Sequence, residues 1–61
     1  MGVCIEQIRK FAEENPEDIS RKALAELEMK AADNEEGYVP INAIVQAVGY
    51  PTAMQIEFYP R

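Results

Sequence analysis

The residue types that usually carry out catalysis are scarce in this chain of 61 residues. It has no histidine, so the commonest general base is absent, and Ser20 and Thr52 are its only serine and threonine. Cys4 is the one cysteine, and we expect it to pack beside Ile8 as a small apolar side chain rather than to act as a nucleophile. We therefore expect a protein that is not an enzyme.

Metal binding has equally little support in the sequence. One cysteine and no histidine cannot form a zinc site within a single chain. The acidic segment 33–37 differs from a calcium-binding loop, because its glycine is the fifth residue rather than the sixth and no glutamate follows at the required distance. We expect no metal and no cofactor. This segment and the acids of 13–18 are interpreted as solvated turns, although an acidic surface can also dock on a basic partner.

The net charge of −5 comes from 11 acidic and 6 basic residues. Proteins that bind nucleic acid usually carry a basic patch, and the basic pairs 9–10 and 21–22 stand beside acids instead. No apolar run approaches the roughly 20 residues of a membrane helix, and the N-terminus does not resemble a signal peptide. We therefore expect a cytoplasmic protein that binds neither nucleic acid nor membrane.

A long central helix is predicted over residues 16–33. Asn15 is a favoured N-cap residue, and Pro16 suits the first helical position. Apolar residues then recur every four positions and define a core-facing side, at Ile19, Ala23, Leu27 and Ala31. Ala25, Met29 and Ala32 project from the opposite side.

These three residues, which we call the outer face, are the first candidate interaction site. Two small residues and one flexible methionine suit a contact with a helix of another chain. The alternative is that alanine is simply the best helix former and that Met29 is a single exposed apolar residue.

Two shorter helices are predicted, over 3–14 and over 41–48, and Gly49 followed by Pro51 ends the second. The tail over 52–59 is ambiguous. Its alternation of apolar and polar residues indicates a strand, whereas Thr52 and Gln55 resemble a capping box that opens a short helix. We favour an extended tail, which would pair with residues 38–41, although a proline weakens them, or with a second copy of itself.

The sequence thus predicts one small, mainly α domain over 1–61, with three helices and a C-terminal extended or short helical tail. A chain this short buries a modest core, so we expect it to self-associate. The tail residues Ile56 and Phe58 complete the candidate interaction site, together with the outer face.

Two resemblances suggest other functions. Residues 41–58 have the shape of a helix-turn-helix, but the second helix would contain no lysine or arginine to contact DNA. Residues 22–59 are similar to the helical N-terminal region of the 24-kDa-type subunit of NADH dehydrogenases. The similar features are an alanine-leucine helix, Gly37-Tyr38-Val39-Pro40, an Ala-Ile-Val helix ending in glycine, and Phe58-Tyr59. That family carries its iron–sulfur cysteines in a following thioredoxin-like domain, and no such domain is included in these 61 residues.

Taken together, these features favour a non-enzymatic, acidic protein-interaction module or small regulator that forms homodimers and binds another protein. The alternatives are a helix-turn-helix transcriptional regulator and an accessory helical domain of a redox complex.

Overall fold

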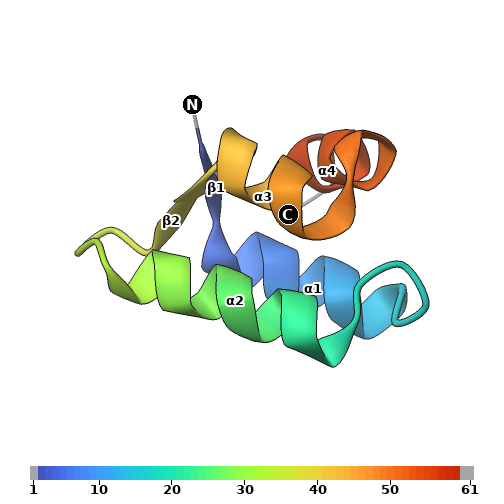
Figure 1. The fold of residues 1–61 in the computed structure, drawn as a ribbon, viewed down its shortest axis with the longest axis horizontal. Helices are drawn as coiled ribbons and strands as arrows, with labels where there is room; N and C mark the ends of the chain where they lie inside the picture. Colours follow the sequence, from blue (N-terminus) through green and yellow to red (C-terminus); the bar gives the residue numbers. More distant parts are fainter. Residues whose placement is uncertain (1, 60–61) are drawn as a thin grey trace.

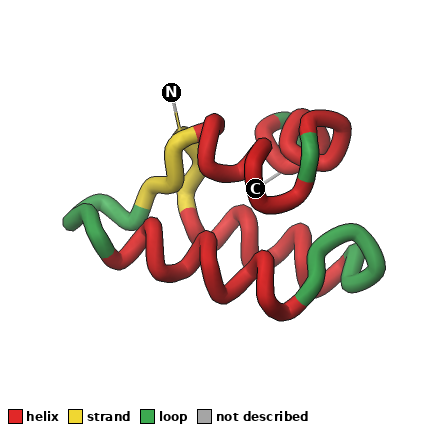
Figure 2. Tube along the Cα trace, in the orientation of Figure 1, coloured by secondary structure: helices red, strands yellow, loops and turns green. Residues whose placement is uncertain are grey.

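The computed structural model describes residues 2–59, and its chain begins with a short strand rather than a helix (Figure 1). In order, the elements are β1 (Gly2–Cys4), α1 (Ile5–Glu14), α2 (Arg21–Ala32), β2 (Tyr38–Pro40), α3 (Ile41–Val48) and α4 (Tyr50–Glu57). Helices α1 and α2 form an antiparallel hairpin, α3 and α4 pack over it, and the β-ribbon closes one end (Figure 2). The prediction of a mainly helical domain is confirmed, but residues 2–59 contain four helices rather than three.

The predicted helix over 3–14 is two residues too long at its start. Val3 lies in β1 opposite Val39 of β2, and both side chains are buried. β-Branched residues lose rotamer freedom in a helix and pack well on a pleated sheet, so a strand suits Val3 better. Ile5 continues the ladder, because its backbone N–H donates to the Gly37 carbonyl at 2.9 Å, and α1 begins at this residue.

The proline that weakened residues 38–41 as a strand turns out to be compatible with pairing. The strands pair antiparallel, with Gly2 opposite Pro40. Hydrogen-bonded and non-hydrogen-bonded pairs alternate along an antiparallel ladder, and the Ile5–Gly37 bond places Gly2–Pro40 at a non-bonded pair. Pro40 therefore costs the ladder no hydrogen bond. The strand partner of this segment is the N-terminus and not the tail.

The central helix is shorter than predicted, because α2 begins at Arg21 and not at Pro16. Asn15 ends α1 instead of opening α2, since its backbone N–H and its side-chain amide both donate to the Phe11 carbonyl. The cap of α2 is Ser20, whose hydroxyl accepts from the Ala23 N–H at 3.1 Å. The intervening turn still brings Ile19 into the core, as its place in the apolar repeat predicted.

The tail is helical, which corrects the preference for an extended segment. Gly49 alone joins α3 to α4, with φ 91° and ψ 161°, a backbone conformation that is open essentially only to glycine. Pro51 lies in the first turn of α4, where a proline removes no helical hydrogen bond. Ala53 and Ile56, three residues apart, then face the interior.

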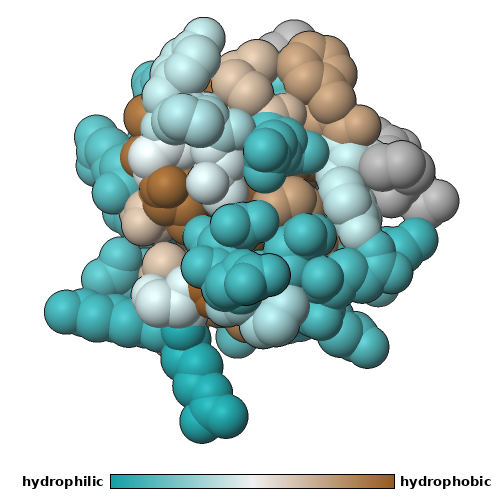
Figure 3. Space-filling model, turned by 90° about the vertical axis from the view of Figure 1, so that its right-hand side faces the viewer, coloured by the Kyte–Doolittle hydropathy of each residue, from teal (hydrophilic) through white to brown (hydrophobic). Residues whose placement is uncertain are grey.

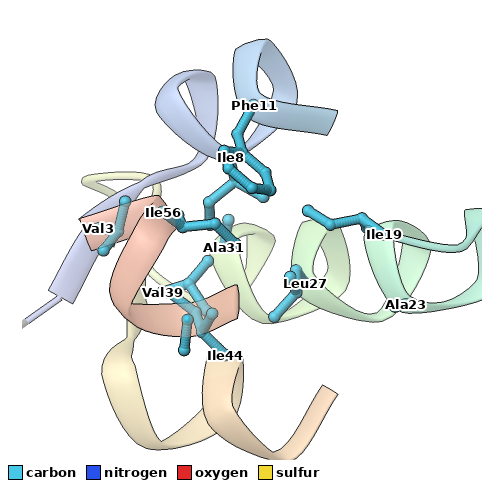
Figure 4. Packing of buried hydrophobic residues seen from close by; sticks show 11 residues of the cluster. Val3, Ile8, Phe11, Ile19, Ala23, Leu27, Ala31, Val39, Ile44 and Ile56 are labelled. Atoms are coloured by element: carbon cyan, nitrogen blue, oxygen red, sulfur yellow. The ribbon is translucent and has the colours of Figure 1, made fainter. Parts of the chain in front are cut away.

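All four helices and both strands contribute to one core (Figure 4). Its buried apolar members are Val3, Ile8, Phe11, Ile19, Ala23, Leu27, Ala31, Val39, Ile44, Ala53 and Ile56. The core-facing side predicted for the central helix is thereby confirmed. No helix within residues 2–59 is long and apolar enough to cross a bilayer.

One buried polar side chain fastens α4 to α1. Glutamine is usually exposed on a helix at the protein surface, but Gln7 is only 8% exposed. Its side-chain amide donates to the Ile56 carbonyl at 2.7 Å, one of the carbonyls that a helix C-terminus leaves without an intrahelical partner. Tyr59 packs edge-on against Phe11, with ring centroids 5.1 Å apart. These two contacts fix the orientation of the C-terminal end of α4.

Candidate functional site

The outer face of α2 has the helical phase that the sequence predicted. Ala25, Met29 and Ala32 are exposed, whereas Ala23 and Leu27 are buried on the opposite side. Met29 is 71% exposed, so most of its side chain is accessible to solvent. The face is therefore accessible to another chain.

The two tail residues of the candidate site, Ile56 and Phe58, face different sides of the helix. Ile56 is fully buried in the core, so it cannot contact a partner in this fold, and its inclusion among the interaction residues was wrong. Phe58 is 75% exposed. Successive helical residues are rotated by about 100°, so positions two apart point to nearly opposite sides, whereas a strand would have placed both on one face.

A larger apolar feature on α4 was missed by the sequence analysis. Tyr50 is 65% exposed, and with Met54 and Phe58 it forms an i, i+4, i+8 series, which we call the α4 ridge. Residues at this spacing share one side of a helix, and eight residues span roughly 12 Å along the axis. Met54 is the middle residue of this series, and its side chain is half-buried. The four-residue spacing of these side chains could have indicated the ridge from the sequence. The interpretation of the tail as a strand concealed it, because residues four apart share a helix side only if the segment is helical.

The α4 ridge lies in a part of the molecule that is poor in formal charge, where Glu57 is the one charged residue between Tyr50 and Phe58. Residues 37–56 contain no charged side chain, and residues 31–59 contain no lysine or arginine. Apart from Glu57 at the end of α4, the charged side chains of residues 2–59 lie on α1, on α2 and in the turns that follow them. Figure 3 shows the hydropathy of one face, where most of the apolar and intermediate side chains lie in the upper half and hydrophilic side chains predominate in the lower half. A surface rich in tyrosine, phenylalanine and methionine and poor in charge resembles the centre of a protein–protein interface.

A shallow groove of about 440 Å³ runs between α2 and α3. Its rims are polar, with Glu26 and Lys30 on α2 facing Asn42 and Gln46 on α3, and its lining includes small residues such as Ala43. It contains no nucleophile, and nothing in its lining identifies a ligand.

Cys4 borders a second hollow, of about 310 Å³, together with Glu6, Gln7, Lys10 and Tyr38. The thiol is half-buried and free, at the position that precedes α1. Cys4 was predicted to pack beside Ile8 as a small apolar side chain; it lies at the end of β1, opposite Tyr38, and is not among the buried core residues. Among residues 2–59, no group of three or more histidine, cysteine, aspartate or glutamate side chains is arranged to hold a metal ion.

Comparisons with protein-family models, with curated proteins and with solved structures found no match for this chain. The similarity of residues 22–59 to the NADH dehydrogenase subunit therefore gains no support beyond the residues that suggested it.

Proposed function

We propose that this protein is a non-enzymatic interaction module that binds another protein through the α4 ridge. The observation that carries the proposal is the exposure of Tyr50 and Phe58 on one side of α4. Tyr50 lies within a stretch of twenty uncharged residues, 37–56, and Phe58 follows just beyond it, after Glu57. Aromatic residues dominate the binding energy of protein interfaces, because they bury a large area at a low cost in side-chain entropy.

The way the core holds α4 supports a preformed binding site. Ala53 and Ile56 anchor the inner side of the helix, and Gln7 and Phe11 hold its C-terminal end. A surface that already has its binding geometry before the partner docks loses less conformational entropy on binding than a surface that must first become ordered. The partner we expect is a protein with an apolar groove and few charges at the contact, since an unpaired buried charge would be costly there.

The alternative function, a helix-turn-helix regulator, would use the same two helices. Phosphate contacts need lysine or arginine, and α3 and α4 offer none. A protein partner is therefore the better proposal for this surface.

The proposal is tested by affinity capture from the native host, with three baits compared by quantitative mass spectrometry. The first bait is the unmodified protein, and the second is Tyr50→Glu/Phe58→Lys. An acid at the start of a helix and a base at its end both suit the helix dipole, so these changes should leave α4 folded. The third bait, Tyr38→Thr, removes an exposed tyrosine outside the α4 ridge and keeps a residue type that suits a strand.

We expect one protein to be captured by the first and third baits and to be reduced at least about 30-fold with the second, the loss typical of a single hot-spot residue. Equal recovery by the first two baits would refute the proposal. Recovery that disappears on nuclease treatment would favour the helix-turn-helix alternative instead.

A further inference from the structure

The charges of α2 are arranged against its helix dipole. Arg21 and Lys22 occupy its first turn, which contains no acid, and Asp33 caps its C-terminus, followed by Glu35 and Glu36. Acids stabilise the N-terminal end of a helix and bases the C-terminal end, so both ends carry the less favourable sign. Lys30 is the one base of the last turn, and it lies on the α3 side, where it borders the groove.

In the part of the chain that the structure describes, these end charges form no ion pair. Within residues 2–59 the ion pair is Arg9 with Glu28, at 2.9 Å. Glu17 and Asp18 precede α2 in the chain, but neither forms an ion pair with its first turn. The basic and acidic ends are all exposed, and they flank the outer face with Met29 at its centre. A feature that costs the isolated helix some stability suggests a compensating contact elsewhere.

From this we infer that the outer face of α2 is a contact between two copies of this chain, whose α2 helices pack antiparallel about a twofold axis near Met29. In such a pair the basic end of each helix meets the acidic turn of the other, so both unfavourable ends are compensated at once. Ala25 lies opposite Ala32 of the second copy, and small residues at these positions allow the two helices to approach closely. Parallel packing would instead bring like charges together at both ends.

The surface meets the requirement of a twofold contact, in which one patch must be complementary to itself. The outer face also points away from the core, so the α4 ridge is not needed for the contact and the inference does not depend on the proposed partner protein. The two sites can therefore be tested separately.

The test uses charge reversals at either end of α2 and sedimentation velocity at tens of micromolar protein. Arg21→Glu/Lys22→Glu makes both ends acidic, and Glu35→Lys/Glu36→Lys makes both ends basic. Both changes bring α2 into better agreement with its dipole, so they should not unfold it. The four changes combined in one chain keep the net charge at −5 and exchange the two ends.

We expect the unmodified chain to be dimeric and each double variant to dissociate at least about tenfold more readily, because like charges would meet across the contact. The combined variant, and an equimolar mixture of the two double variants, should restore dimers with an affinity near that of the unmodified chain. Lys10→Glu, an exposed change on α1, should have no effect on the dimer and serves as the control.

Three results would overturn the inference. These are a monomeric unmodified chain, double variants that dimerise as the unmodified chain does, and a combined variant that remains monomeric although circular dichroism shows it to be folded. Dissociation of the double variants together with restoration by the combined variant would exclude parallel packing, in which all four forms bring like charges together at both ends.

Discussion

Leu27→Ala lowers the free energy of unfolding by roughly 2–5 kcal/mol, the usual cost of a large-to-small change in a core. Leu27 is almost fully buried at the centre of α2. A domain of this size has a total stability of roughly 3–9 kcal/mol, so the variant is expected to lose a large part of its stability and to melt at a markedly lower temperature. Thermal unfolding followed by circular dichroism measures the effect.

Met29→Glu is the matched comparison, because it changes an apolar residue two positions along the same helix. Its side chain is exposed, so the monomer should retain its stability within about 0.5 kcal/mol. Association of two copies should be lost, since the contact would bury an unpaired charge. Unfolding of the Met29→Glu monomer would mean that Met29 supports the core, and unchanged fold and association would place any contact elsewhere.

Ile56→Ala should also cost roughly 2–5 kcal/mol, whereas Phe58→Ala should cost less than about 0.5 kcal/mol. The difference arises because α4 buries the first side chain completely and exposes the second. Denaturant unfolding of the two variants, fitted with a common m-value, gives both free energies. An extended tail would place both side chains on the same face, so similar costs for the two changes would contradict the helix.

The helices were the more predictable part of the fold, because they leave a local signal in the sequence. The apolar repeat through Ala23, Leu27 and Ala31 gave the correct inner side of α2, and Gly49 correctly marked the end of α3. Both signals depend on residues within one or two turns of each other. The outer face of α2 was identified correctly as exposed for the same reason.

The strands and the tail depended on contacts that are distant in sequence. Val3 becomes a strand residue because Val39 lies opposite it, and neither residue indicates the other. Gln7 looks like a surface residue until the Ile56 carbonyl, 49 positions away, is brought beside it. The alternating tail satisfied a strand pattern and a helix pattern equally, and burial of Ala53 and Ile56 against the hairpin decided between them.

Part of the candidate site was predictable, because it depends on the local pattern of a single helix. Exposure of Met29 followed from the period of one helix. The strand pattern of the tail placed Ile56 and Phe58 on one face, so it could not show that only Phe58 is exposed. The relation among Tyr50, Met54 and Phe58 did require it, because these residues share a side only when the segment is helical. The incorrect secondary structure of the tail therefore concealed the grouping of these three residues.

The central claim is that the molecule has two separate contact surfaces, the outer face of α2 for a second copy and the α4 ridge for another protein. The most direct measurement is the mass of the complex with the captured protein, determined by sedimentation velocity for three forms of the chain. We predict two copies of each protein for the unmodified chain, one of each for Met29→Glu, and free dimers for Tyr50→Glu/Phe58→Lys. Loss of the partner with Met29→Glu, together with its retention by Tyr50→Glu/Phe58→Lys, would contradict the account.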